Sequence, residues 1–408
     1  MKKFKTIWYI SKYIMPPSEC YVGNRGHYLI KELKELGYKT YIINSNSYNK
    51  MRNIKLKKKY NFRNLDNLYY LTIDVLKYYK SYSMRRVLSW LDFELKLLFA
   101  PLYKLSKPDI LIVSSLSLLT IINGLIIKFR YKCKLIFEIR DIWPLSLIEY
   151  KGYSKNNPII LLLRLIEYIG YFFSDQIVGT MPLLSEHVSS IIGNHKKVKI
   201  IPIGFDINAA NIENKITNKT INKFLDSDAV TITYLGSIGV SNKLETFFET
   251  IEKLSHNKNI NFLVIGEGEL KNYFIKNYGY LENLAICDSI KKKYVNNILK
   301  RSDILYLSLG KNKIWDYGQS LNKLIDYMLA SRPIVASYTG YKSMINEANC
   351  GEFVEAENCD DLENKFIELS KLTNEERSKI GERGKTWLRK HRTYKKLALD
   401  YSLIIENL

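Results

Sequence analysis

The chain has 408 residues, of which 46% are hydrophobic and 25% charged, and its formal net charge is +21. The length suits two domains of roughly 200 residues each, and the composition excludes a disordered or collagen-like chain. Five cysteines without a Cys-x-x-Cys pair exclude a disulfide framework and a zinc ribbon, so we expect a reducing, cytoplasmic location.

Most of the positive charge lies in the amino-terminal half. Residues 1–210 carry 33 Lys and Arg against 15 Asp and Glu, whereas residues 211–408 carry 29 against 26. A basic half suits nucleic acid, a phosphate-bearing substrate or an anionic lipid surface. The chain has no helix-turn-helix pattern, zinc finger or ribonucleoprotein motif, so we expect no nucleic-acid partner. The basic run 50–60 and the tyrosine pairs after it favour an anionic membrane surface, with a solvated loop as the alternative.

Short apolar runs alternate with helical stretches through the first half. Such alternation is typical of parallel βαβ units, so we predict a Rossmann-like domain over residues 1–206. Residues 110–127 are uncharged but include Ser, Thr, Asn and Gly, and we interpret them as a strand and a helix rather than a membrane span. Residues 158–173 are also very apolar, and they predict either a core helix or a helix at a membrane interface. The predicted strands of this half lie within residues 6–10, 39–43, 110–113, 134–138, 176–179 and 198–202.

A polar stretch separates this half from a second series of the same kind. Residues 207–228 form the predicted linker, and residues 229–385 form a second predicted Rossmann-like domain whose strands begin at Val230 and end at Ser337. Parallel sheets bind ligands at the carboxyl ends of their strands, so we expect two crevices that face each other across a cleft. Residues 386–408 predict two further helical segments.

Two motifs of the first domain fall at predicted strand ends. Gly23 lies in the loop after the first strand, and Arg25 lies at the start of the following helix, where a guanidinium can bind an anion. Arg140 and Asp141 follow the strand over 134–138, at the edge where chemistry is expected. The structural alternatives are an ordinary surface loop for the first motif and a strand-capping ion pair for the second.

The second domain holds the most informative segment, residues 317–337. Its turn, Gly318 to Ser320, offers uncommitted backbone N–H groups at a helix start, where the helix dipole favours a diphosphate. Asp326 follows about two turns later and is placed to accept both hydroxyls of a ribose. Pro333 then ends the helix before a buried strand. The segment therefore predicts a nucleotide site.

Together these motifs resemble glycosyltransferase family 4, whose fold is GT-B, over nearly the whole chain and most strongly over residues 230–337. The resemblance implies that the last helix crosses back to the first domain. It also places Gly23 and Arg25 near the donor phosphates and the acceptor. The sequence Arg140-Asp-Ile-Trp-Pro144 is similar to that of aminosugar transferases of bacterial O-antigen and capsule assembly. Many family members have His-Asp here, so the resemblance implies charge balance by Arg140 and substrate orientation by Asp141 rather than a histidine base.

The resemblance also assigns the donor site. The family has Arg after the first glycine of the second domain, where this chain has Ser237. The family also has a lysine before the next helix. Asn242 and Lys243 bracket that position here, so Lys243 is the implied cation. Asp326 stands at the second of two family glutamates and Gly318 at the first, so sugar recognition passes to neighbouring polar residues. The implied donor-binding set is Gly23, Arg25, Gly236, Ser237, Asn242, Gly266, Glu267, Gly268, Gln319, Ser320, Leu321, Asn322, Lys323 and Asp326.

The resemblance thus implies a retaining glycosyltransferase that uses a nucleotide diphosphate donor, most simply UDP-linked, and a polyprenyl-diphosphate-linked saccharide at the inner face of the cell membrane. Asp226-Ser-Asp228 precedes a strand instead of following one, and the five histidines lack ligand spacing, so we expect no metal and no cofactor. Lys291–Lys293 predicts a solvated turn. Two alternatives stay open: a nucleotide-sugar epimerase of the same layout, and a non-catalytic protein that binds a membrane surface.

Overall fold

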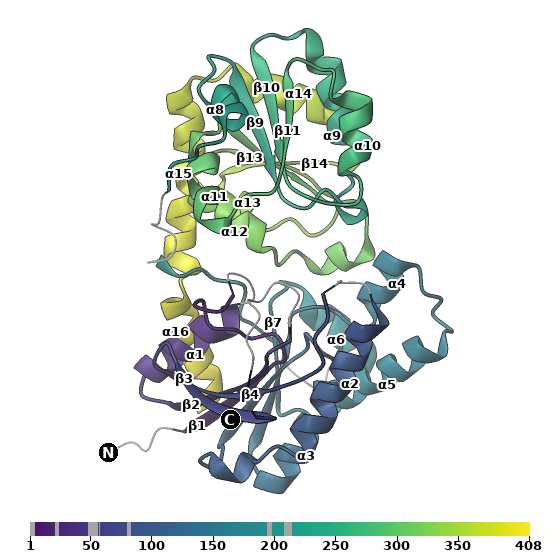
Figure 1. Ribbon diagram of the computed structural model, residues 1–408, viewed down its shortest axis with the longest axis vertical. Coiled ribbons are helices and arrows are strands. Elements are labelled where there is room, and N and C mark those ends of the chain that lie inside the picture. Colours follow the sequence, from purple (N-terminus) through teal and green to yellow (C-terminus); the bar gives the residue numbers. More distant parts are fainter. Residues whose placement is uncertain are drawn as a thin grey trace. The chain divides into compact units, whose positions relative to one another are not determined.

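The computed structural model describes residues 5–20, 24–47, 56, 58–79, 83–193, 198–207 and 214–408. The chain forms two compact units (Figure 1). Unit 1 contains Met1–Gly204 and Tyr394–Leu408, and unit 2 contains Phe205–Thr393. Each unit is built around a mainly parallel sheet, which confirms the predicted α/β fold class.

The sheet of unit 1 has the strand order β3-β4-β2-β1-β5-β6-β7-β8. All neighbours pair in parallel except β3 and β4, which form an antiparallel hairpin at the edge. The sequence analysis did not predict this hairpin, although its turn, Asp66-Asn67, has two positive φ angles of the kind that two-residue hairpin loops require. The strand bounds are β1 (Thr6–Ile10), β2 (Lys39–Ser45), β3 (Tyr60–Leu65), β4 (Leu68–Ile73), β5 (Ile110–Ser114), β6 (Lys134–Ile139), β7 (Gln176–Gly179) and β8 (Val198–Ile200).

Helices cover both faces of this sheet because successive strand residues point to opposite sides. Ile112 and Ile136 pack with α1 (Arg25–Glu35) and α16 (Tyr394–Glu406) in one core cluster. Val113 and Phe137 point the other way, toward α3 (Thr120–Tyr131) and α5 (Pro158–Phe173). On this second side α2 (Met84–Leu98) lies beside α3, and α6 (Leu184–Ile192) lies beside α5. The short helices η1 (Leu102–Lys104) and α4 (Leu145–Lys151) complete the unit.

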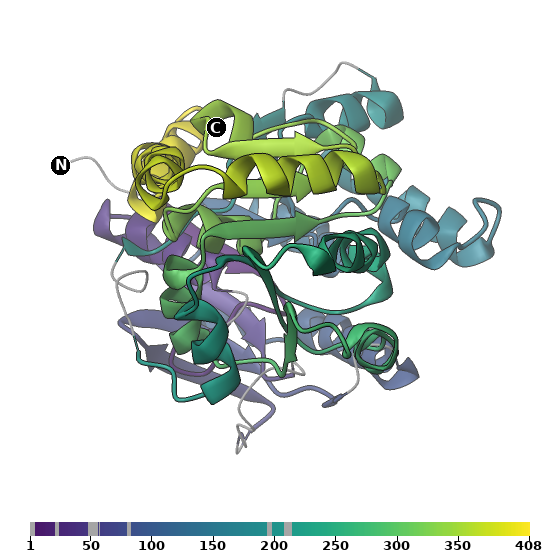
Figure 2. The same ribbon diagram turned by 90° about the horizontal axis from the view of Figure 1, so that it is seen from above.

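The sheet of unit 2 is entirely parallel, in the order β11-β10-β9-β12-β13-β14. Its helices flank the green strands on both sides (Figure 2). The strands are β9 (Val230–Leu235), β10 (Ile260–Ile265), β11 (Leu284–Cys287), β12 (Ile304–Ser308), β13 (Ile334–Ser337) and β14 (Gly351–Val354). The helices are α8 (Lys219–Leu225), η2 (Val240–Asn242), α9 (Glu245–Lys253), η3 (Leu254–His256), α10 (Lys271–Tyr278), α11 (Lys292–Arg301), η4 (Lys313–Tyr317), α12 (Asn322–Leu329), α13 (Ile345–Ala348), α14 (Cys359–Ser370) and α15 (Asn374–His391).

The boundaries of the units differ from the expected ones at two places. The whole of the expected linker falls within unit 2, which begins at Phe205. The linker contains α8, whose Ile221 and Phe224 pack against β10 and β11. The sequence analysis missed this helix because only two of its side chains, Ile221 and Phe224, are buried, and the rest of the segment is mostly polar. At the other end, α15 stays with unit 2 and α16 belongs to unit 1, so the chain returns to unit 1 between Thr393 and Tyr394.

Within the described residues, no helix is long and apolar enough to cross a membrane.

Candidate functional site

The candidate donor site lies at the carboxyl ends of the central strands of unit 2. Strand β9 has β10 on one side and β12 on the other, so the order of the strands reverses here. Open parallel sheets bind their ligands at such a point, beyond the strand ends. The turn at Gly236 follows β9, and the turn from Gly266 to Gly268 follows β10.

The glycines of these two turns hold the loops against each other. A Cβ on Gly266 would overlap the carbonyl oxygen of Gly236, and a Cβ on Gly268 would overlap that of Ile238. The close approach allows the N–H of Ile238 to donate to the carbonyl of Glu267 at 2.9 Å. Gly266 and Gly268 therefore have a packing role, and their place in the donor-binding set stays a prediction. The exposed carboxylate of Glu267 accepts from Lys271 at 2.9 Å.

Lys323 is a half-buried cation that lies against the turn at Gly236. It is the second residue of α12, and its side chain folds back toward Gly236. Its Nζ donates to the hydroxyl of Tyr234 at 3.1 Å and lies 4.3 Å from the centre of that ring. Burial lowers the pKa of Lys323 to about 7, because an ammonium loses hydration there. Among the described residues no carboxylate pairs with it.

The turn before α12 carries further polar groups that the fold does not use. Gly318 has φ +91°, which redirects the chain from η4 into α12. Gln319 is only 3% exposed, and neither its amide oxygen nor its amide nitrogen has a hydrogen-bond partner in the described part of the chain. The buried hydroxyl of Ser320 has none there either. Leu321 caps α12 without a side-chain hydrogen bond, so the amides that begin at Asn322 keep donors for an anion.

The carboxylate of Asp326 is bound by a residue that the sequence analysis treated as solvent-exposed. It forms an ion pair with Lys292, at the start of α11. The two residues lie far apart in the sequence, and only the packing of α11 against α12 brings them together. The next residue, Tyr327, anchors α12 to the end of β9, where its hydroxyl accepts from the N–H of Leu235 at 2.9 Å. A ribose that binds Asp326 must therefore displace Lys292 or share the carboxylate with it.

Lys243, the implied cation, is exposed in the loop between β9 and α9. Its backbone is left-handed, with φ +45°, and its carbonyl accepts from the hydroxyl of Ser308 at 2.9 Å. Its aliphatic stem packs on Gly310, and among the described residues its Nζ has no ion-pair partner. Ser237 is also exposed and Asn242 is half-buried. These side chains are accessible, whereas the half-buried ammonium of Lys323 lies directly against Gly236.

Unit 1 places Arg140 and Asp141 directly after β6, as predicted. The hydroxyl of Ser115, which follows β5, accepts from the N–H of Arg140 at 2.9 Å and donates to the carbonyl of Asp141 at 3.4 Å. This contact fixes the two residues at neighbouring strand ends. The Nε of Arg140 is buried without a partner in the described residues. Loss of hydration raises the pKa of the Asp141 carboxyl, and the positive charges of Arg140 and Arg86 partly offset this increase.

Arg25 does not have the accessible position that the sequence analysis expected. It is buried, and its guanidinium donates to Glu138 at 2.8 Å and to the carbonyl of Ile201 at 2.7 Å. The other oxygen of Glu138 accepts from Tyr9. We therefore reassign Arg25 from anion binding to a buried ion pair that joins α1 to β6. Gly23 lies outside the described residues.

Lys12 is a candidate that the sequence analysis missed. It is the second residue after β1 and is fully buried. Its Nζ donates to the hydroxyl of Ser89 at 2.9 Å. The ring centres of Tyr13 and Tyr78 lie 4.9 and 5.4 Å from the same Nζ. Burial lowers the pKa of Lys12 to about 7. The sequence signal that could have identified Lys12 is its position just after the first predicted strand.

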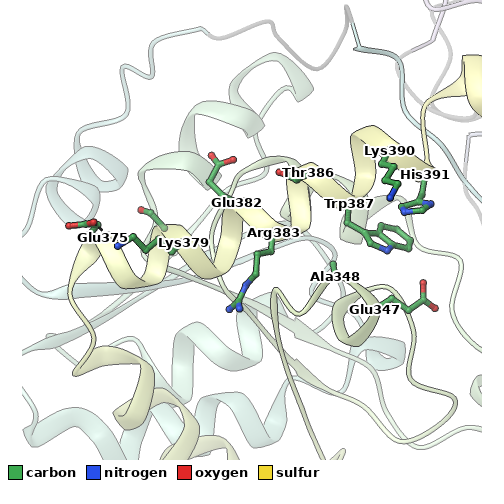
Figure 3. Close-up of a pocket in the computed structure, with 11 residues that line it drawn as sticks. Glu347, Ala348, Glu375, Lys379, Glu382, Arg383, Thr386, Trp387, Lys390 and His391 are labelled. Atoms are coloured by element: carbon green, nitrogen blue, oxygen red, sulfur yellow. Dashed lines mark ion pairs between the residues drawn. The ribbon is translucent and has the colours of Figure 1, made fainter.

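Unit 2 also has an open pocket of about 580 Å³ on the outer side of α15 (Figure 3). Glu347 and Trp387 lie at one end of it, and Glu375 and Lys379 lie at the other end, where they form an ion pair at 2.8 Å. None of the predicted site residues lines this pocket. Among the described residues no group of three or more His, Cys, Asp or Glu could hold a metal ion.

Comparison with known proteins gives one family match and several similar structures. Residues 229–371 match the family model described as Glycosyl transferases group 1. No curated protein matches the chain. Sucrose-phosphate synthase from Thermosynechococcus elongatus is similar in structure, with a TM-score of 0.73, 12% identity and coverage of 99% of this chain and 98% of that one.

Two further solved structures are similar over the whole length. A UDP-forming trehalose-phosphate synthase from Burkholderia xenovorans has a TM-score of 0.72 and 11% identity, with 99% of each chain covered. The Anabaena protein HepE, solved with UDP and glucose, has a TM-score of 0.65 and 10% identity, with 99% of this chain and 100% of that one covered. At these identities the likeness shows the fold, which is GT-B, while the family match covers α12 and both glycine turns.

Proposed function

We propose that the chain is a retaining glycosyltransferase that moves a sugar, in particular an N-acetylated aminosugar, from a UDP-linked donor to a polyprenyl-diphosphate-linked saccharide. The reaction would belong to the synthesis of a bacterial surface polysaccharide at the inner face of the cell membrane. The observation that carries the proposal is the group of polar donors at the start of α12. Lys323, the amide of Gln319 and the hydroxyl of Ser320 stand there without a carboxylate partner among the described residues.

These donors suit a leaving diphosphate. Negative charge develops on the diphosphate as its bond to the anomeric carbon breaks, and fixed donors stabilise that charge most effectively where water is excluded. Lys323 and the first amides of α12 supply such donors, and the exposed ammonium of Lys243 adds a second cation. Asp326 would then accept the ribose hydroxyls after exchange of Lys292.

Arg140 and Asp141 serve the acceptor in this proposal. The new bond from the acceptor oxygen to the anomeric carbon forms on the face from which the diphosphate leaves, so retention needs no enzymic base. The departing phosphate oxygen takes the proton of the acceptor hydroxyl. Asp141 orients that hydroxyl, and Arg140 balances the charge of Asp141. No metal or cofactor takes part.

A sugar phosphate is the second candidate acceptor, because two of the similar structures are named as sucrose-phosphate and trehalose-phosphate synthases. The basic character of residues 1–210 suits a phosphate on either acceptor. The resemblance of the Arg140–Pro144 sequence to transferases of polysaccharide assembly favours the lipid-linked saccharide.

The test is a panel of UDP-sugars incubated with the full chain and with either a polyprenyl-diphosphate saccharide or glucose 6-phosphate, with UDP release and the glycosylated product both measured. We expect product only with the lipid-linked acceptor, and a loss of at least about 100-fold in kcat/KM for Lys323→Ala. Lys276→Ala, an exposed lysine of α10, is the matched control and should retain activity. Transfer that survives Lys323→Ala would refute the site assignment.

The same incubations separate the remaining alternatives. Interconversion of one UDP-sugar into another without any acceptor would indicate an epimerase. Binding to vesicles without binding of any UDP-sugar would indicate a non-catalytic surface protein.

A further inference from the structure

The outer side of α2 is apolar although it faces solvent. Met84, Leu88, Leu91, Leu95 and Leu98 recur every three or four residues and are between 41% and 74% exposed. This spacing places them on one side of the helix, which is the pattern that normally packs into a core. The opposite side of the same helix is already buried, through Phe93 and Leu97. Helix α2 is therefore apolar on two sides, and only one of them has a partner in the described fold.

Helices α3 and α5 extend this surface. Ile122, Ile126 and Phe129 are exposed on α3, and Phe129 reaches 67%. On α5, a longer set is exposed: Ile159, Leu161, Leu162, Leu165, Phe172 and Phe173. We call the exposed apolar side chains of α2, α3 and α5 the apolar face.

The three helices form one continuous surface because they lie side by side on the same face of the sheet of unit 1 (Figure 1). Glu94 of α2 accepts hydrogen bonds from Thr120 at 2.6 Å and from Asn123 at 2.8 Å, both on α3. Gly170 of α5 lies directly against Ile121 of α3, where an added Cβ would be 3.0 Å from the Ile121 side chain. The apolar face thus lies on a rigid layer rather than on separate loops.

The charges of this surface have one sign. The exposed charged residues of α2, α3 and α5 are Arg85, Arg130 and Arg164, one on each helix. The carboxylates of the same helices are half-buried or buried, and each has a partner. Asp92 pairs with Lys96 at 2.9 Å, Glu94 binds α3, and Glu167 binds His187 at 2.8 Å and Tyr171 at 3.0 Å.

Exposed apolar side chains together with exposed arginines favour a lipid bilayer over a second copy of the chain as the partner. Contiguous exposed apolar patches of this kind are rare on chains that stay in water, and they mark interaction surfaces. A second copy of the chain would bring arginines against arginines without any carboxylate, whereas anionic headgroups supply the counter-charge while apolar side chains enter the acyl boundary. The helices are too short or too polar to cross the bilayer, so they would lie on it.

We propose that the apolar face docks unit 1 on a membrane that contains anionic phospholipid. The inference deepens the proposed function and rests on it for the identity of the membrane-held substrate, since the acceptor side chains Arg140 and Asp141 belong to the same unit. Docking itself requires neither donor nor catalysis. Apolar insertion would supply most of the affinity, and Arg85, Arg130 and Arg164 would supply the preference for anionic lipid.

The test is co-sedimentation of the full chain, without donor, on phosphatidylcholine vesicles with and without phosphatidylglycerol. We expect binding mainly to the anionic vesicles, and a partition coefficient at least about tenfold lower for the Leu88→Ser, Leu91→Ser, Leu95→Ser variant. Circular dichroism should show an unchanged fold because the altered side chains are exposed. Tyr273→Ser with Ile275→Ser, two exposed apolar positions of unit 2, is the matched control and should bind like the wild type.

Three results would overturn the proposal. These are no binding to anionic vesicles, binding that the leucine variant does not weaken, and a dimer of the wild type in analytical ultracentrifugation that the leucine variant abolishes. Titration of a UDP-sugar separates this failure from failure of the proposed function. The leucine variant should bind the donor normally, and loss of vesicle binding with intact donor affinity affects the docking inference alone.

Discussion

Raising the pH from 6 to 8.5 should weaken the binding of a UDP-linked donor by about 30-fold, because the donor requires Lys323 in its charged form. Burial lowers the pKa of Lys323 to about 7 in the free protein. A diphosphate beside the ammonium raises that pKa again. Molecules in which Lys323 is uncharged must therefore take up a proton when the donor binds. The fraction of molecules with uncharged Lys323 grows as the pH rises.

The magnitude follows from this linkage. If only the ammonium form binds, the apparent Kd rises by about twofold at pH 7 and by about 30-fold at pH 8.5 relative to its low-pH limit. The diphosphate of a nucleotide sugar is a diester and does not titrate in this range, so the donor itself adds no pH dependence to the Kd. The neighbouring Tyr234 adds none either, since burial raises its pKa well above its usual range.

Isothermal titration calorimetry in buffers of different ionisation enthalpy measures both quantities. We expect uptake of about half a proton at pH 7 and of nearly one proton at pH 8.5. Lys323→Gln should bind the donor weakly and without a pH dependence, whereas Lys276→Gln should behave like the wild type. Affinity that stays constant between pH 6 and 8.5, or binding without proton uptake, would refute a role for Lys323 as the titrating cation of the donor site.

Three further predictions concern single residues. Asp326→Ala should weaken donor binding by about tenfold through loss of the ribose contact. Lys292→Ala should leave donor affinity equal or make it tighter, because it frees the Asp326 carboxylate. Calorimetric titration of the donor compares the two variants. Gly266→Ala should lower the free energy of unfolding by about 1–3 kcal/mol, because its Cβ would overlap the carbonyl of Gly236. Gly239→Ala, with its nearest atom 3.6 Å away, should cost less in the same urea titration. Arg25→Met should lower that free energy by about 3–5 kcal/mol, because a buried carboxylate loses its partner; an unchanged unfolding midpoint would contradict the assignment of a buried ion pair.

Much of the fold follows from patterns that are local in the sequence. The runs at Thr6–Ile10 and Val230–Leu235 were predicted as strands because full burial of a parallel strand demands consecutive apolar residues, and both are central strands in the structure. The hairpin of β3 and β4 was missed because its outer strand alternates between half-buried and exposed positions, so the apolar signal is weak. Helix α8 was missed for a similar reason.

Candidate site residues were predictable by position but not by state. Arg140, Asp141 and the turn before α12 lie at strand ends or a helix start, as expected from the order of elements. The state of each charged group depends on contacts that the sequence does not indicate. Arg25 and Glu138 are separated by 113 positions, and neither position reveals that the other neutralises it.

By itself, then, the sequence determined two parallel α/β units and the segments that carry polar groups at their strand ends, because apolar periodicity and turn chemistry act over a few residues. Only the tertiary structure decided which charges are free. It buried Arg25 on Glu138, paired Asp326 with Lys292, and turned Lys323 onto Tyr234. It also left one side of α2, α3 and α5 in solvent, because burial depends on which elements pack together across the whole chain.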